Sequence, residues 1–243
     1  MNIVAIVQAR MGSTRFPGKV MRPVLEKPLL LHVLDRINRV KSIHRIVVAT
    51  TVHQQDDPID RLTREHGYDV YRGSEEDVLD RYYHAARAHG ADVVVRITAD
   101  CPLIAPSVIE QVLEYYLRAE GAYDYVSNTL ERTYPRGMDT EVFTFESLEV
   151  AWKEARDPAS REHVTLYIYR HPDRFRLGSV TYPQDLSSWR LTVDTIEDFE
   201  LVKRVIESLY PQKPRFDFVD IIDVLERHPE WRKLNQHIRQ KEV

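Results

Sequence analysis

NIVAIVQARMGSTRFPGK, residues 2–19, is the stretch that decides the fold. Its apolar run Ile3–Val7 predicts a buried strand, and the strand opens directly into a loop with two glycines, two hydroxyls and three cations. Such loops are where α/β sheets bind ligands. Glycine lets backbone N–H groups approach phosphate oxygens, arginines can fork onto them, and lysine adds a compact charge. The stretch therefore predicts a polyphosphate site whose cations are Arg10, Arg15 and Lys19.

We call residues 9–19 the signature loop. It lacks the Gly-Lys-Ser/Thr ending of a P-loop and the Gly-x-Gly-x-x-Gly fingerprint of dinucleotide-binding proteins. P-loop ATPases and dehydrogenases are therefore disfavoured. The competing interpretation is a strand-to-loop junction that carries solvated charges without any ligand.

Strand and helix patterns alternate through the first half of the chain. Strand-like runs at 45–50, 69–71 and 93–97 are separated by stretches with helical spacing at 29–40, 58–66, 75–89 and 107–119. This order predicts an α/β fold with a Rossmann-like, mostly parallel sheet and helices on both faces. Asp57 and Ser107 are the expected caps of two of these helices.

The second half is less regular. We expect strands at 123–127, 140–145 and 175–181, helices at 146–155 and 161–169, a strand-like run at 191–193, a helix at 196–209 and a helical tail at 219–227 and 231–240. With no linker or repeat in the sequence, the prediction is one domain over 1–243 with an inserted α+β lobe at about 123–182.

Composition excludes several classes of protein. A net charge of −4 over 243 residues, with a pI near 6.2, argues against a nucleic-acid binder, which carries a broad basic face. No apolar run approaches the ~20 residues of a membrane span, and no basic leader precedes the first strand. One cysteine suits the reducing cytosol. We expect a cytoplasmic protein that binds neither nucleic acid nor membrane.

Three segments together resemble a known family. The signature loop, the run RITADCPLI at 96–104 and the run LTVDTIEDF at 191–199 are similar to three motifs of the cytidylyltransferases that make activated sugars. This family includes CMP-KDO synthetase, acylneuraminate cytidylyltransferase and the spore coat polysaccharide biosynthesis protein F type. The segments at 73–81 and 134–139 extend the likeness along most of the chain. The resemblance implies a fold of the nucleotide-diphospho-sugar transferase type and a homodimer.

The resemblance also implies the roles of individual residues. Catalysis would depend on Arg10, Arg15, Lys19, Asp100 and Asp194. Magnesium (Mg2+) would be held by Asp100 and Asp194, in keeping with the one or two carboxylates that this ion usually takes from a protein. The nucleotide would be bound by Ala9, Arg10, Gly12, Ser13, Arg15, Lys19 and Arg72, and the sugar by Arg136 and Asp139.

The residues themselves leave alternatives open. Asp100 and Asp194 each follow a strand-like run, which would bring both to one sheet edge, but each could instead cap the following helix. Arg72 could form a surface ion pair with Glu75 or Glu76. Pro135 and Gly137 are explained equally well by a turn. The charged stretch Arg161–His163 lies near substrate by resemblance or is simply the start of a helix.

The function that the resemblance implies is transfer of CMP from CTP to a sugar, with release of pyrophosphate. By resemblance the acceptor is an acidic 2-keto sugar of a surface polysaccharide pathway. A sugar 1-phosphate nucleotidyltransferase, a metal-dependent glycosyltransferase and a non-catalytic nucleotide-binding regulator are the alternatives. Catalysis of CMP transfer consists mainly of positioning and electrostatic stabilisation, because charge moves onto the departing pyrophosphate.

Overall fold

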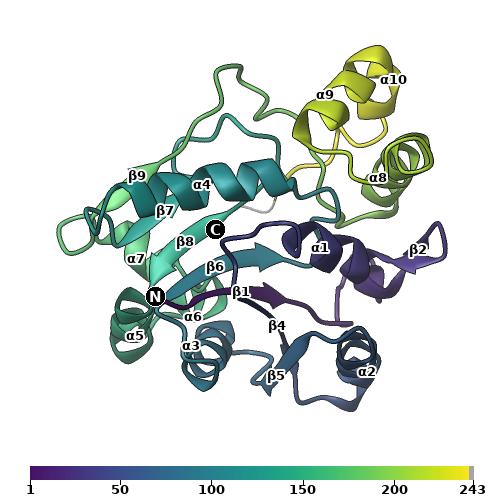
Figure 1. Ribbon diagram of the computed structural model, residues 1–243. Coiled ribbons are helices and arrows are strands. Elements are labelled where there is room, and N and C mark those ends of the chain that lie inside the picture. The colour runs from purple at the N-terminus through teal and green to yellow at the C-terminus, as the bar shows by residue number, and fades with distance from the viewer. Residues whose placement is uncertain (241–243) are drawn as a thin grey trace.

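The computed structural model describes residues 1–240 (Figure 1). One sheet is formed by seven strands: β1 (Ile3–Gln8), β4 (Arg45–Thr51), β5 (Asp69–Gly73), β6 (Val93–Thr98), β7 (Tyr125–Ser127), β8 (Glu141–Thr144) and β9 (Leu177–Ser179). Their order across the sheet is β5-β4-β1-β6-β8-β7-β9. Pairing is parallel except at β8, which runs antiparallel to both neighbours. The predicted mostly parallel sheet is confirmed.

Helices cover both faces of this sheet (Figure 1). They are α1 (Leu29–Ile37), α2 (Asp57–Glu65), α3 (Val78–Ala88), α4 (Pro106–Arg118), α5 (Phe145–Glu154), α6 (Pro158–Glu162), α7 (Leu166–Arg170), α8 (Ile196–Leu209), α9 (Phe218–Arg227) and α10 (Pro229–Arg232). In β1, Ile3, Ala5 and Val7 pack in the cluster that contains α1 and α4, whereas Val4 and Ile6 pack with α3 and α5. A strand buried on both sides has no polar face, which explains the unbroken apolar run of its sequence.

The segment at 123–182, expected as an inserted lobe, contributes β7, β8 and β9 to the main sheet. These strands lie beyond β6, and α5 packs beside α3 beneath them. Within this segment, the prediction of a single helix at 161–169 is wrong. The backbone breaks at Val164, whose φ of 44° is left-handed, so that α6 and α7 are separate short helices.

Two later elements also differ from expectation. The run at 191–193 is no strand: its apolar side chains are buried, but the backbone forms only an isolated parallel bridge, between Arg136 and Arg190. The tail at 231–240 is helical only to the end of α10 at Arg232 and continues in turns. At both places the apolar residues correctly predicted that side chains are at least partly buried, but they did not predict the conformation of the backbone.

Both expected helix caps are displaced. The N-cap of α2 is Asp56, one residue before Asp57, and its side chain makes no capping bond. Asp56 instead accepts hydrogen bonds from the Met11 backbone N–H, at 2.7 Å, and from the Thr51 hydroxyl. At α4 the N-cap is Ala105, and Ser107 donates to Asp217 at 2.8 Å. The buried Asp56 therefore anchors the signature loop rather than a helix.

Shorter elements follow the signature loop. The 3-10 helix η1 (Lys19–Met21) begins after Gly18, whose φ of 69° suits glycine, and β2 (Pro23–Val24) pairs with β3 (Lys27–Pro28). A second 3-10 helix, η2 (Gln54–Asp56), leads into α2. Because Gly18 N–H donates to the Met11 carbonyl at 3.0 Å, the loop closes on itself and turns Lys19 back toward the sheet.

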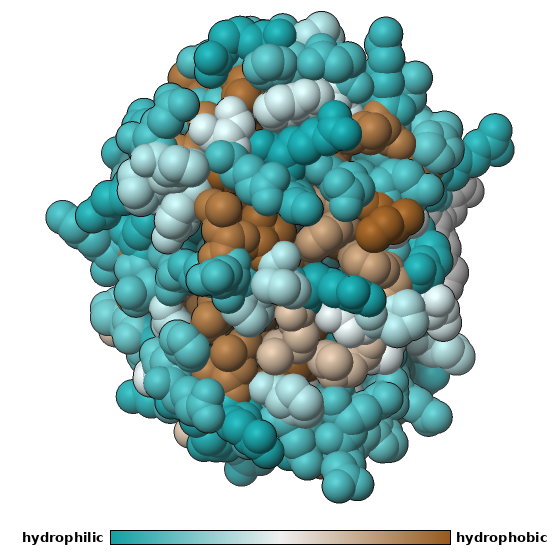
Figure 2. All heavy atoms as spheres, turned by 90° about the vertical axis from the view of Figure 1, so that its right-hand side faces the viewer, coloured by the Kyte–Doolittle hydropathy of each residue, from teal (hydrophilic) through white to brown (hydrophobic). Residues whose placement is uncertain are grey.

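The arrowheads of β1 and β6 point to the right of Figure 1, and Figure 2 shows the molecule from that side. Apolar side chains gather in the middle of this face, and hydrophilic ones surround them. Exposed apolar area of this kind is compatible with a contact between copies of the chain, and the homodimer stays a prediction. Within residues 1–240, no helix has both the length and the apolar character required to cross a bilayer.

Gly137 offers a test of the close approach between the Arg136 and Arg190 segments. Its φ is +98°, and a Cβ there would lie 2.6 Å from the Leu191 carbonyl carbon and 2.7 Å from the Thr192 nitrogen. We expect Gly137→Ala to lower the free energy of unfolding by about 3 kcal/mol, because strain and a backbone clash add. Urea unfolding followed by fluorescence measures this change.

Gly67→Ala is the matched control. Gly67 also has a positive φ, +78°, but a Cβ there would meet nothing within 4 Å. Only the backbone strain remains, so the expected loss is about 1 kcal/mol. Equal losses in the two variants would contradict the proposed contact of Gly137 with the Leu191 backbone.

Candidate active site

A cavity of about 940 Å³ opens where β1 and β6 end. The signature loop, the residues after β6, the turn before β8 and the segment before α8 all contribute to its wall. Among the lining residues are Ala9, Arg10, Gly12, Ser13, Arg15, Lys19, Thr98, Asp100, Cys101, Arg132, Arg136, Asp139, Thr192 and Asp194. The structure thus brings together every site residue predicted from the sequence except Arg72.

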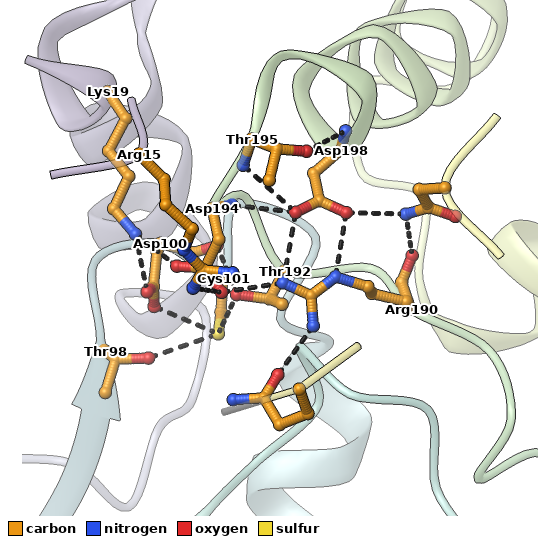
Figure 3. Close-up of polar contacts among 12 residues, drawn as sticks. Arg15, Lys19, Thr98, Asp100, Cys101, Arg190, Thr192, Asp194, Thr195 and Asp198 are labelled. Atoms are coloured by element: carbon orange, nitrogen blue, oxygen red, sulfur yellow. Dashed lines mark hydrogen bonds and ion pairs between the residues drawn. The ribbon is translucent and has the colours of Figure 1, made fainter. Parts of the chain in front are cut away.

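Lys19 joins the two predicted carboxylates (Figure 3). Its Nζ lies 2.9 Å from Asp100 Oδ2 and 2.7 Å from Asp194 Oδ1. The three side chains are only 11%, 26% and 14% exposed, in that order. Residues 19, 100 and 194 therefore meet at one point, although they are widely separated in the sequence.

Opposite charges decide the protonation of this cluster. Burial alone would lower the pKa of Lys19, but the charges of Asp100 and Asp194 and their hydrogen bonds outweigh it and raise that pKa above 10.5. Burial alone would raise the pKa of Asp100. The Lys19 charge, with hydrogen bonds from Thr98, Lys19 and Cys101, outweighs burial and holds that pKa below 3.8. At neutral pH, Lys19 and Asp100 are both ionised.

Asp194 reaches the cluster by a route that the sequence did not suggest. No strand delivers it; instead the Val193 N–H and the Thr192 hydroxyl donate to the Asp100 carbonyl, at 2.8 and 3.2 Å. The capping alternative for Asp194 is also wrong, because Thr195 is the N-cap of α8 and forms a capping box with Asp198. Asp100 caps no helix either, since α4 begins beyond Ala105. Both carboxylates are left to face the cavity.

The two signature-loop arginines lie nearer the solvent. Arg15 Nη2 is 3.1 Å from Asp194 Oδ2, and Arg10 Nη1 is 3.3 Å from Glu75 Oε1. Their side chains are 43% and 47% exposed. The Arg10–Glu75 pair is the more exposed of the two, and exposed pairs are weak, so Arg10 can leave its carboxylate for another anion at little cost. Arg15 reaches the solvent as well, but its partner Asp194 is only 14% exposed.

Arg72 lies outside the cavity wall. Its side chain donates to the carbonyl oxygens of Thr51 and His53, at 2.8 and 2.9 Å, and forms an ion pair with Asp57 at 2.7 Å. The alternative partner Glu75 pairs with Arg10 and His53 instead. Arg72 therefore joins β5 to the start of α2. Its position before Gly73 in the sequence did not predict this contact.

The predicted sugar-binding residues line the opposite wall. Asp139 receives two hydrogen bonds from Arg132, at 2.7 and 3.0 Å. Within residues 1–240 the Arg136 guanidinium makes no hydrogen bond or ion pair. Burial lowers the pKa of Arg136, and the nearby charges of Arg132 and Arg190 lower it further. Arg136 is thus a cation beside other cations, in a wall of the cavity.

Sequence reasoning missed further charged residues of the wall. Arg132 had no signal beyond its nearness to Asp139 in the chain. Arg96 forms a buried ion pair with Glu141, which also accepts a hydrogen bond from the Tyr125 hydroxyl at 2.7 Å. The available signal for this pair was that Arg96 and Glu141 are charged residues within two otherwise largely apolar strands, β6 and β8.

The stretch Arg161–His163 is divided. Glu162 and His163 line the cavity, in agreement with the resemblance. Arg161 lies outside the wall: its Nε donates to Asp77 at 3.0 Å, and Asp77 is the N-cap of α3. Arg161 therefore connects α6 to α3.

A glycine-containing cationic loop after the first strand of a mostly parallel sheet, in contact with two carboxylates, is suited to binding an anionic ligand. The chain belongs to the cytidylyltransferase family, whose model matches residues 4–227.

Known proteins agree with this assignment. The chain is 33% identical to the spore coat polysaccharide biosynthesis protein SpsF of Bacillus subtilis, over 94% of this chain and 96% of that protein. It is 28% identical to 3-deoxy-manno-octulosonate cytidylyltransferase of Trichlorobacter lovleyi, over 76% and 81%. A solved cytidylyltransferase from Leptospira borgpetersenii superposes with a TM-score of 0.91 at 34% identity, and the match covers 100% of both chains.

The ionisation of Asp100 predicts a pH dependence of stability. Because the pKa of Asp100 is lower in the folded chain than its ordinary 3.8, its contribution is present above pH 3.8 and is lost as the pH falls through the folded-state pKa. We expect Asp100→Asn to be less stable than the wild type at pH 7 and the difference to shrink below pH 3.8. Urea unfolding across this range, without added divalent cation, measures the difference. A constant difference would contradict the assignment.

Proposed function

We propose that the chain transfers CMP from CTP to an acidic 2-keto sugar for surface polysaccharide synthesis and releases pyrophosphate. The observation that carries the proposal is the contact of Lys19 with both Asp100 and Asp194 at the base of the signature loop. The names of two relatives, a spore coat polysaccharide biosynthesis protein and a 3-deoxy-manno-octulosonate cytidylyltransferase, support the acceptor class.

We propose that Asp100 and Asp194 hold Mg2+. One oxygen of each carboxylate already lies within 2.9 Å of a single cationic nitrogen, so the two can serve one cation. Two carboxylates, completed by water and phosphate oxygens, match the ligand set that magnesium usually takes from proteins. When bound, the ion supplies positive charge against the triphosphate.

The cations of the signature loop would hold the rest of the triphosphate. Arg10 and Arg15 would turn from Glu75 and Asp194 to the β- and γ-phosphates, and the backbone at Gly12 and Ser13 lines the cradle. Lys19 is buried and already ionised, so it stabilises the charge that develops on the departing pyrophosphate. A sugar oxygen attacks the α-phosphorus as the bond from that phosphorus to the pyrophosphate oxygen breaks.

The acceptor would lie against the wall that contains Arg136. Within residues 1–240 the Arg136 guanidinium has no carboxylate within ion-pair distance, so it can offer a carboxylate-bearing sugar two N–H donors and a positive charge. Asp139, held by Arg132, is placed to accept a sugar hydroxyl. We also propose a homodimer that works in the cytoplasm, where CTP is made.

An assay matrix tests the activity. Each of the four nucleoside triphosphates is combined with acidic 2-keto sugars, neutral sugars and sugar 1-phosphates in the presence of Mg2+, and pyrophosphate is measured. We expect release with CTP and an acidic 2-keto sugar. Asp100→Asn is expected to slow that reaction by about 100-fold while circular dichroism is unchanged, because one of the two carboxylates proposed to hold Mg2+ is lost.

The other outcomes identify the alternatives. Pyrophosphate released only with sugar 1-phosphates would indicate that class of nucleotidyltransferase. Release of a free nucleoside diphosphate would indicate a glycosyltransferase. Tight binding of CTP without turnover of any sugar would indicate a regulator. Each of these results would contradict the proposed reaction.

Arg136→Gln tests how the acceptor is recognised. Loss of a charge-assisted contact is expected to raise KM for the acidic sugar by about tenfold or more, while KM for CTP is unchanged. Arg118→Gln is the control, because Arg118 is 81% exposed on α4 and, within residues 1–240, its ion pair is with Glu114. An unchanged KM for the sugar in Arg136→Gln would remove this residue from the acceptor site.

A further inference from the structure

Arg190 is buried between two carboxylates beside the cavity (Figure 3). Its side chain is 5% exposed. Nη2 donates to Asp194 Oδ2 at 2.7 Å and to Asp198 Oδ2 at 3.1 Å, and Nε donates to Asp198 Oδ1 at 2.9 Å. The guanidinium therefore forks onto one carboxylate and reaches the next with the same nitrogen.

Asp198 fixes this fork in place. It is completely buried at the start of α8 and also accepts hydrogen bonds from the backbone N–H groups of Asp194 and Thr195, at 3.0 and 3.1 Å. A further donor is Asn235 Nδ2, at 2.8 Å. A buried carboxylate with this many donors has one orientation, so Arg190 is held in one position as well.

The two oxygens of Asp194 consequently face different ways. Oδ2 receives Arg190 and also lies 3.1 Å from Nη2 of the more exposed Arg15, whereas Oδ1 contacts Lys19, whose ammonium also contacts Asp100. Rotation of the Asp194 carboxylate would break the 2.7 Å contact with Arg190. Arg190 thereby keeps Oδ1 pointed at the place where the carboxylates of Asp100 and Asp194 converge.

The C-terminal tail supports Arg190 from behind. Asn235, which is 2% exposed, donates to the Arg190 carbonyl at 3.0 Å, and Gln240 Oε1 accepts from Arg190 Nη1 at 2.6 Å. Gln240 also lines the cavity. Turns that follow α10 therefore pack against the residue that orients Asp194.

We propose that Arg190 is a positioning residue that orients Asp194 for the divalent cation, and that Asn235 and Gln240 of the tail hold Arg190 in place. The proposal rests on the function proposed above, because it assumes that Asp194 ligates a metal. Ligand carboxylates are commonly held by such partners, and changing the partner typically weakens metal binding.

Arg190→Lys separates orientation from charge. Lysine keeps the positive charge but cannot fork across two carboxylates. With the α,β-methylene analogue of CTP bound, Mn2+ titrated by electron paramagnetic resonance is expected to bind about tenfold more weakly than to the wild type. Binding of the analogue without metal is expected to be unchanged. Wild-type Mn2+ affinity in a folded Arg190→Lys protein would overturn the proposal.

Arg39→Lys is the matched control. Arg39 likewise contacts a capping aspartate, Asp217 at the start of α9, and a backbone carbonyl, that of Phe216. Arg39 is not in the wall of the cavity. Its variant is expected to bind Mn2+ like the wild type, and an equal loss there would mean that Arg190→Lys acts only through general stability and would overturn the proposal.

Two more variants keep the outcomes distinct. If Asp194→Asn still binds Mn2+ normally, the metal site of the proposed function fails; if it loses Mn2+ while Arg190→Lys does not, only the positioning role fails. Should Arg190→Lys not fold, Gln240→Ala replaces it, since it removes a single contact of Nη1. A smaller loss of Mn2+ affinity is expected in Gln240→Ala, and unchanged affinity would overturn the proposal.

Discussion

The contact of one buried ammonium with two carboxylates is the constraint on which the site depends. Lys19 comes from the signature loop, Asp100 from the end of β6 and Asp194 from the segment before α8. An unpaired charge at this depth would be costly. Lys19 is compensated by both carboxylates and Asp100 by Lys19, whereas Asp194 is also paired with Arg15 and Arg190. The fold closes around this cluster because its charges are compensated only when all three segments are in place.

Backbone hydrogen bonds connect this cluster to the neighbouring parts of the cavity wall. The segment before α8 donates to the Asp100 carbonyl through Val193, and its Arg190 bridges to Arg136, which lines the same cavity. Asp56, buried beneath the signature loop, fixes the loop from the other side by accepting the Met11 N–H. The signature loop and the wall that contains Arg136 are thus parts of one connected unit rather than independent loops on a scaffold.

Sequence reasoning succeeded where the signal is local. The alternation of strands and helices and the cations of the signature loop follow from periodicity and from neighbouring residues, and both are confirmed as features of the fold and of the cavity wall. It failed where a choice depends on distant partners. Asp56 and Asp57 have the same capping chemistry, and only Met11 and Thr51 decide between them. Arg190 could not be found, because its role depends on a tail that packs from 45 residues away.

The cations of the site differ in burial, and burial determines which of them can change partners. Arg190 and Asp198 are nearly inaccessible and share several hydrogen bonds, so exchanging their partners would leave a buried charge unpaired. Arg10 and Arg15 are almost half exposed, and exposed pairs contribute at most about 1 kcal/mol. In the proposed function, a triphosphate would take Arg10 and Arg15 from Glu75 and Asp194 while Arg190 and Asp198 stay paired. The exposed arginines can change partners, whereas the buried Arg190 cannot. The site can therefore bind a highly charged ligand and keep its own geometry.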